Sequence, residues 1–210
     1  MTSVKRRYDG AGRREQARVR RLAVVVAARD LFLELGFRRT TVAAVAERAG
    51  VSAESIYKGF GTKAALAKAA FDLAVAGDDE PVAVADRPQM QALREEPDVR
   101  RKIAMFLEGL AQRQARSADV QILVRDGRHV DEALVPVWQA MEREGLAGMT
   151  ALAGHLAETG QLRVDPEEAR DVLWNHLAID SYERLVLGRG WSLQRYTAWM
   201  THSVLSALCA

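Results

Sequence analysis

The sequence predicts an all-α protein, because apolar residues recur along most of the chain at spacings of three and four. That period places apolar side chains on one face of a helix, whereas a half-buried strand needs strict alternation, and no alternating run is long enough to predict one. Of the 210 residues, 49% are hydrophobic and 28% are charged, which is ordinary for a globular chain. Such a chain can bury a core as one large domain or two small ones.

A first helix is predicted from about Arg13 to Leu35. Gly36 follows the last apolar residue and can adopt the left-handed conformation that closes a helix. The apolar face contains Val24, Val25, Ala28, Leu31, Phe32 and Leu35.

Two short helices come next and meet at a tight turn. Thr41 can cap a helix over residues 42–49, and Ser52 can cap one over residues 53–58. Between them, Gly50 provides a backbone position that carries no Cβ penalty. Two short helices joined in this way form a helix-turn-helix, whose second helix enters the major groove of DNA.

The rest of the chain predicts further helices. A helix capped by Thr62 is expected to run to residue 76, and a linker with a short helix at 89–94 follows it. Asp165 and Pro166, followed by two acids, are a strong signal for a helix start. The later helices are expected over residues 98–116, 118–125, 131 or 135 to 158, 166–187 and 193–208.

Charge divides the chain into two dissimilar parts. Residues 1–68 contain 15 Lys and Arg against 6 Asp and Glu, a net charge of +9. Residues 69–210 contain 15 against 22, a net charge of −7. A basic segment beside an acidic one suggests that the first part meets a polyanion. Residues 1–20 are the most basic stretch, either an arm that reaches DNA or a solvated segment.

Enzymes, metal sites and membrane segments find no support in the sequence. The single cysteine, Cys209, excludes an intramolecular disulfide and indicates a reducing cytoplasm. The four histidines lie far apart, and no motif for a serine nucleophile, a phosphate loop or a dinucleotide fold occurs. No apolar run approaches the roughly 20 residues that a bilayer needs, and no secretory signal is expected. We therefore predict a cytoplasmic protein without cofactor or metal that is not an enzyme; an active site built by the C-terminal helices is a remote alternative.

Residues 27–66 carry a specific combination of residues in one uninterrupted register. They read AARDLFLELGFRRTTVAAVAERAGVSAESIYKGFGTKAAL. The matching positions are Leu31-Phe32, Gly36-Phe37, Thr40-Thr41, Val45-Ala46, Ala49-Gly50-Val51-Ser52, Ile56-Tyr57, Phe60 and Lys63. In these positions the segment resembles the DNA-binding domain of the tetracycline-repressor (TetR) family of bacterial transcriptional regulators.

The resemblance implies an organisation in three parts. Residues 1–20 are the basic N-terminal arm, and residues 21–68 are a three-helix DNA-binding domain of the helix-turn-helix type. Residues 69–210 are a helical domain that binds an effector and dimerises. One residue departs from the family pattern: Gly59 stands where relatives usually have a Tyr or His that contacts the phosphate backbone.

The DNA-binding residues are carried over by position or chosen for their chemistry. Hydroxyls and lysines can donate to phosphate oxygens, and the first residues of the second short helix can meet base edges. Glu54 can accept from a cytosine amino group, although we favour its alternative role as an acid near a helix N-terminus. Tyr57 can instead belong to the core. The complete set is Thr40, Thr41, Ser52, Ala53, Glu54, Ser55, Tyr57, Lys58 and Lys63.

Two further sets of residues belong to the C-terminal part. Large apolar residues mixed with isolated polar ones can line a pocket for a mostly apolar effector, or they can be ordinary core residues. The effector candidates are Phe106, Trp138, Met141, Trp174, Asn175 and Tyr182. The resemblance also implies a dimer formed by the last two helices, although the same apolar stripe can pack inside one subunit. The dimer candidates are Leu193, Tyr196, Met200, Val204 and Leu208.

The predicted function is that of a DNA-binding transcriptional regulator. In this family such a protein is most often a repressor that binds a palindromic operator as a homodimer and is released by a small-molecule effector. The expected partners are double-stranded DNA, a second copy of the chain and a largely apolar effector, with no membrane. The alternative is a helical module that binds a small molecule or a protein and retains a degenerate helix-turn-helix.

Overall fold

The structure is a computed structural model that describes residues 10–78 and 87–209. The described residues form helices and connecting turns, and none of them lies in a strand, so the predicted all-α class is confirmed. The chain divides into two compact units, Met1–Ala70 and Phe71–Ala210. Most of the basic arm predicted over residues 1–20 lies either outside the described residues or in the first turns of the first helix.

The first unit is built from α1 (Gly10–Leu35), α2 (Val42–Ala49), α3 (Ala53–Phe60) and the first residues of α4 (Lys63–Ala76). The predicted bounds of α2 are confirmed, and α3 extends two residues beyond its predicted end. The rings of Phe32 and Phe37 lie 5.3 Å apart in the core. The other core side chains come from all four helices and include Val24, Ala28, Leu31, Val45, Ala46, Ile56 and Leu66.

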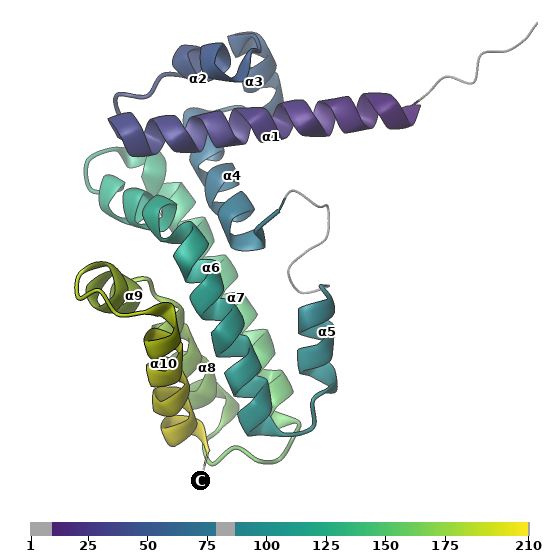
Figure 1. Ribbon diagram of the computed structural model, residues 1–210, viewed down its shortest axis with the longest axis vertical. Coiled ribbons are helices and arrows are strands. Elements are labelled where there is room, and N and C mark those ends of the chain that lie inside the picture. The colour runs from purple at the N-terminus through teal and green to yellow at the C-terminus, as the bar shows by residue number, and fades with distance from the viewer. Residues whose placement is uncertain (1–9, 79–86, 210) are drawn as a thin grey trace, which may run out of the picture. The chain divides into compact units, whose positions relative to one another are not determined.

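The second unit contains the last residues of α4 and the remaining helices. In Figure 1, α6 and α7 are the long helices of this unit, and α10 lies beside α6. Its core draws on α6, α7, α8 and α10. The elements are α5 (Pro88–Glu95), α6 (Val99–Gly127), the 3-10 turn η2 (Glu132–Leu134), α7 (Val135–Ala157), α8 (Pro166–Leu177), α9 (Asp180–Tyr182), the π-helical turn η3 (Glu183–Leu187) and α10 (Leu193–Leu208).

The prediction of two helices over residues 98–125 is wrong, because α6 is continuous. Ser117, which lies between the two predicted helices, is buried within α6. Its hydroxyl donates to the Arg113 carbonyl one turn earlier at 2.9 Å, so the side chain finds a partner inside the helix.

The single helix predicted over residues 166–187 is also wrong. Helix α8 ends at Leu177, and Ala178 has a non-helical backbone with ψ 137°. The freed carbonyls of His176, Leu177 and Ala178 face the side-chain amide of Gln114 at 3.3, 3.3 and 3.4 Å. Gln114 comes from α6 and is buried, so a partner distant in sequence compensates for the break in α8.

Several helix starts confirm the capping predictions. The side chains of Asp165 and Ser192 accept from backbone N–H groups three residues later, at 2.8 and 3.2 Å. Thr62 likewise accepts from the Ala65 N–H at 3.0 Å. None of the described helices combines the length and the hydropathy required to cross a bilayer.

Candidate nucleic-acid interface

The turn between α2 and α3 has the geometry of a helix-turn-helix. Gly50 lies in the left-handed region, with φ 66° and ψ 35°. Its N–H donates to the Glu47 carbonyl at 3.2 Å, and the N–H of Val51 donates to the Ala46 carbonyl at 3.0 Å. A residue with a Cβ is strained in this conformation, which explains the glycine in physical terms.

Helix α3 presents one face to the core and the other to solvent. Ile56 is 2% exposed, whereas Tyr57 is 55% exposed. Ser52 caps the helix by accepting from the Ser55 N–H at 3.1 Å, and the two serine hydroxyls lie 2.8 Å apart. The outward residues of α3 that the sequence proposed for DNA are Ala53, Glu54, Ser55, Tyr57 and Lys58, of which Ala53 is partly exposed and the other four are exposed.

Because Tyr57 is exposed, the alternative that its side chain belongs to the core is wrong. The exposed hydroxyl of Thr41 accepts from the Ala44 N–H at 3.1 Å and starts α2. Thr41 and Ser52 thus each hold a helix N-terminus at the surface, where backbone N–H groups favour an anion such as a DNA phosphate.

Thr40 is not available to a phosphate, contrary to its predicted role. The side chain is 1% exposed. Its hydroxyl lies 3.0 Å from the Leu31 carbonyl and 2.9 Å from the Gly36 carbonyl, and either oxygen can accept its proton. The residue instead satisfies the end of α1, where the last carbonyls lack helical partners.

Lys63 also has a structural role that the sequence did not predict. Its ammonium donates to the Phe37 carbonyl at 2.8 Å and to the Thr40 carbonyl at 3.1 Å, and it lies 4.2 Å from the centre of the Phe37 ring. These contacts explain a cation at the start of α4 without an anionic ligand. Lys63 thereby ties the start of α4 to the loop between α1 and α2.

Arg38 and Arg39 are cations that the predicted site omitted. Both are exposed in the segment between α1 and α2. Within the described part of the chain, neither side chain forms a hydrogen bond or an ion pair. Their position directly before Thr40-Thr41 was the signal that sequence reasoning overlooked.

Gly59 leaves open space at the end of α3. A Cβ added at this residue would have nothing within 4 Å, and its backbone is not left-handed. The Gly59 carbonyl accepts from Arg21 of α1 at 3.4 Å, and the same guanidinium lies 4.3 Å from the Phe60 ring centre. Arg21 thus contacts the last residues of α3 through both interactions.

The C-terminal end of α4 is held by two arginines of the second unit. Arg116 on α6 donates to the carbonyls of Ala74 and Val75 at 3.2 and 3.3 Å. Arg87, directly before α5, donates to the Ala76 carbonyl at 2.8 Å and forms a bidentate pair with Asp78 at 2.7 Å. We call these two arginines and the carbonyls that they contact the α4 clamp.

The α4 clamp satisfies the carbonyls that a helix end leaves without partners. Two cations at a helix C-terminus also interact favourably with its dipole. Helix α4 begins in the first unit and ends in the second, and the α4 clamp lies within the second unit.

The six effector candidates occupy different environments. Phe106, Met141 and Tyr182 are buried, whereas Trp138 is partly exposed and lies under the guanidinium of Arg128 at 4.7 Å. Trp174 and Asn175 lie on the exposed face of α8. Within the described residues, no ring contact or hydrogen bond joins two of the six.

The dimer candidates other than Leu193 are buried within a single subunit. Tyr196, Met200, Val204 and Leu208 each have 0% exposed surface. Their packing inside the subunit was the alternative left open by the sequence, and it leaves these four side chains no surface for a partner. These four side chains are buried because α10 packs against α6 and α8. The periodicity of α10 alone does not reveal that packing.

Two surface hollows accompany the second unit. A groove of about 610 Å³ lies between α6 and α10, and its lining includes Met105, Leu193 and Thr197. A second hollow, of about 600 Å³, lies near the start of α8 and is lined by four acids together with Asn175 and His176. The effector candidate Asn175 lines the second hollow, and the dimer candidate Leu193 lines the groove.

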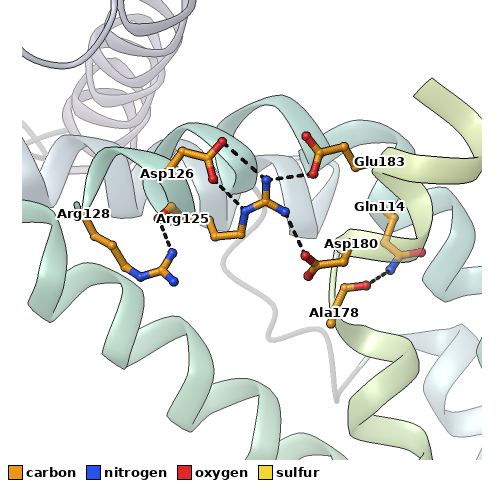
Figure 2. A network of polar contacts seen from close by, with 7 residues as sticks. All are labelled: Gln114, Arg125, Asp126, Arg128, Ala178, Asp180 and Glu183. Carbon is orange, nitrogen blue, oxygen red and sulfur yellow. Dashed lines mark hydrogen bonds and ion pairs between the residues drawn. The ribbon is translucent and has the colours of Figure 1, made fainter. Parts of the chain in front are cut away.

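A charged network joins the end of α6 to the segment after α8 (Figure 2). Arg125 pairs with Asp126 at 2.8 Å, Asp180 at 3.3 Å and Glu183 at 2.7 Å. The hydrogen bond from Arg125 lowers the pKa of Asp126, and its charge adds to that effect. Because the arginine is satisfied by acids of its own chain, this network has a structural role.

Residues 24–70 match the family model described as bacterial regulatory proteins, tetR family. The match covers α2, α3, the C-terminal part of α1 and the first part of α4, which are the elements of the helix-turn-helix described above. The chain therefore resembles the TetR-family regulators, as its sequence predicted. No curated protein matches the sequence.

Solved structures extend the likeness to the second unit. The fatty acid degradation regulator FadR from Bacillus halodurans is 18% identical, covers 88% of this chain and 97% of its own, and has a TM-score of 0.67. FadR from Bacillus subtilis, in complex with stearoyl-CoA, is 16% identical, with coverages of 89% and 98% and a TM-score of 0.69. A TetR-family regulator from Marinobacter aquaeolei is 15% identical, with coverages of 93% and 98% and a TM-score of 0.64. These likenesses establish a shared all-helical fold.

Proposed function

We propose that this chain, which resembles the TetR-family regulators, is a repressor that binds a palindromic operator as a homodimer and is released by a small-molecule effector. The family match and the shared fold support a DNA-binding transcriptional regulator with a ligand-binding C-terminal domain. This class agrees with the expectation that the protein is not an enzyme. The observation that carries the proposal is α3, whose start is capped and whose outward face is polar and free of core contacts.

The reading residues are assigned by their exposure. We propose that Ser55 meets base edges, while Glu54 acts as an acid near the N-terminus of α3. Thr41, Ser52 and Tyr57, together with Arg38 and Arg39, are proposed to meet phosphates. Thr40 and Lys63 leave the set because their polar atoms are bonded inside the domain.

The experiment that tests this assignment replaces Ser55 by alanine. The full chain is titrated with a duplex enriched from random DNA and with single base-pair variants of that duplex. Ser55→Ala is expected to change the order of preference at particular base pairs and to leave binding to unrelated DNA nearly unchanged. An equal loss on all sequences would assign Ser55 to the backbone and would contradict the reading role of α3.

The dimer surface is proposed to be the exposed face of α8 and α10. Trp174 on α8 is 36% exposed. On α10, Trp199 is partly exposed and His202 is exposed. An exposed tryptophan is typical of an interface centre, because it combines large apolar area with a polar edge. We call Trp174, Asn175, Trp199 and His202 the dimer face.

The effector is proposed to be largely apolar and to bind within the second unit. Phe106, Met141 and Tyr182 remain the candidates that face its interior. The stearoyl-CoA in the Bacillus subtilis structure supports an apolar effector for this fold. A ligand releases DNA only when it binds the DNA-incompetent state more tightly than the competent one, and we propose that the α4 clamp differs between these states.

Gly59 motivates one alternative function. A chain that lacks the aromatic phosphate contact of its relatives can be a ligand-binding or protein-interaction module whose helix-turn-helix has lost DNA binding. Sequence-specific DNA binding by the full chain separates the two functions, since the alternative predicts none.

A further inference from the structure

Arg113 on α6 is a partly buried arginine whose guanidinium lacks an acidic partner. In the described part of the chain, no carboxylate pairs with it and no atom accepts a hydrogen bond from it. Other partly buried arginines of the same unit pair with acids: Arg87 with Asp78 at 2.7 Å, and Arg125 with Asp126 at 2.8 Å. A cation withdrawn from water without a partner costs free energy, so Arg113 requires a physical explanation.

The guanidinium of Arg113 lies between an aromatic ring and a glycine. The guanidinium carbon lies 5.3 Å from the centre of the Phe106 ring, two turns earlier on α6. Gly109 lies one turn earlier, and a Cβ added there would come within 3.2 Å of one guanidinium nitrogen. Glycine inside a helix costs about 1 kcal/mol relative to alanine. The glycine therefore permits the guanidinium of Arg113 to lie close to the helix backbone.

The electrostatics at Arg113 favour an anion. Burial, and next the charge of the nearby Arg116, lower the pKa of the Arg113 guanidinium to about 10. Arg113 is thus still cationic at neutral pH and has a second guanidinium close by. The planar fork of an arginine matches the geometry of a carboxylate or a phosphate, which it can bind through two hydrogen bonds.

We propose that Arg113 binds the anionic end of the effector, a carboxylate or a phosphate, while Phe106 contacts its apolar part. This inference rests on the proposed function, because it names the chemical class of the effector: an amphiphile with an anionic group. The ligand supplies the partner that the guanidinium lacks. Its charge also acts on Arg116, which donates to the last carbonyls of α4 and so connects the site to the α4 clamp.

The test uses the full-length chain and three probes with the same straight alkyl chain. One probe ends in a carboxylate, one in a phosphate and one in a neutral alcohol. Calorimetric titration below the micelle concentration is expected to give at least one anion a Kd about tenfold or more below that of the alcohol, as a hydrogen bond to a charged group implies. The anion that shows the larger preference identifies the head group.

Arg113→Met is expected to abolish the preference for the anion. The matched control is Arg128→Met, because Arg128 also stacks on an aromatic ring, that of Trp138, but donates to the Arg125 carbonyl. The control is expected to retain the preference. The inference is overturned if wild-type protein binds the anions and the alcohol equally, if it binds no probe, or if the preference survives Arg113→Met.

The melting temperature without ligand distinguishes an anion-binding role of Arg113 from a purely structural one. Without ligand, Arg113→Met is expected to leave the melting temperature unchanged or to raise it, because the variant removes an unpaired charge and keeps the length of the side chain. A large fall in melting temperature would assign Arg113 to support of the fold and overturn the inference. DNA binding is measured in parallel, since its absence in the wild-type chain contradicts the proposed function and not the anion site.

Discussion

The cations of the first unit serve different purposes. Lys63 is bonded to two backbone carbonyls, whereas Arg38 and Arg39 are exposed. Only cations that reach solvent can replace the counterions that surround DNA, and these determine how steeply binding falls with salt.

The first prediction follows from this difference. Arg38→Gln and Arg39→Gln are each expected to flatten the plot of log K against log salt concentration by about 1. Lys63→Met is expected to leave the slope unchanged and to lower the free energy of unfolding by about 1–3 kcal/mol, because two carbonyls lose a charged donor. Titrations at several salt concentrations and urea unfolding measure the two effects. A reduced slope for Lys63→Met would return that residue to the DNA interface.

The second prediction concerns Gly59. Gly59→Ala is expected to stabilise the protein by about 0.5–1 kcal/mol, because the position is helical and a Cβ meets no atom within 4 Å. Gly50→Ala is the matched control and is expected to cost about 1–2 kcal/mol, because its φ is 66°. Thermal unfolding distinguishes them. Destabilisation by Gly59→Ala would mean that the end of α3 needs its glycine.

Residue identity alone predicted the capping roles of Thr41, Ser52 and Thr62, because a cap needs only its own helix. It did not predict the roles of Thr40 and Lys63, since their partners lie on other elements. Burial is a tertiary property, and a hydroxyl in a sequence pattern looks the same whether it faces DNA or a carbonyl.

Among the elements, α4 spans the boundary between the two units. Both ends of this helix are held by cations, with Lys63 at its start and the α4 clamp at its end. Gly77, with φ 84°, terminates the helix, and its N–H donates to the Leu73 carbonyl at 2.9 Å. A Cβ at Gly77 would lie 3.2 Å from the Arg116 side chain, so the glycine also permits the approach of Arg116.

The third prediction tests the α4 clamp. Arg116→Met is expected to accelerate hydrogen exchange of the Gly77 N–H and its neighbours by about tenfold, since the loss of one charge-assisted interaction is worth about 1.5 kcal/mol. Arg170→Met is the control, because Arg170 pairs only with its sequence neighbour Asp171 at 2.8 Å. Unchanged exchange in Arg116→Met would show that the clamp does not stabilise the end of α4.

Helix existence and most helix starts were predictable, because periodicity and caps are local signals. The break after Leu177 was not, since it depends on Gln114, which lies 64 residues from Ala178 in the sequence. The continuity of α6 through Ser117 was not predicted either. A serine is compatible with a helix interior when its hydroxyl bonds to a carbonyl of the preceding turn, as that of Ser117 does.

At the scale of the whole molecule, the fourth prediction separates the dimer face from the core. Trp174→Glu is expected to shift the protein from dimer to monomer without unfolding it, because the residue is exposed in the single subunit. Met200→Glu is expected instead to cost several kcal/mol of stability, because an unpaired acid enters a fully buried position. Sedimentation velocity and circular dichroism distinguish the outcomes. A Trp174→Glu variant that remains a dimer would place the interface elsewhere.

The charge asymmetry of the chain fits a division between a part that binds a polyanion and a part that regulates it. The net charge is +9 over residues 1–68 and −7 over residues 69–210, from 15 Lys and Arg in each part against 6 and 22 Asp and Glu. The class of protein was predictable because the motif lies in one continuous segment. The effector site was not, because it requires side chains from several helices to be brought together.

Selection of DNA from a random pool by the full-length wild-type chain tests the central claim most directly. A twofold-symmetric dimer with one reading helix per subunit predicts an enriched inverted repeat whose half-sites lie about one helical turn, or a multiple of it, apart. The enriched duplex is expected to bind about a thousandfold or more tightly than a shuffled one at physiological salt. Failure to enrich any sequence, or enrichment of a site without twofold symmetry, would contradict a dimeric regulator that reads DNA through α3.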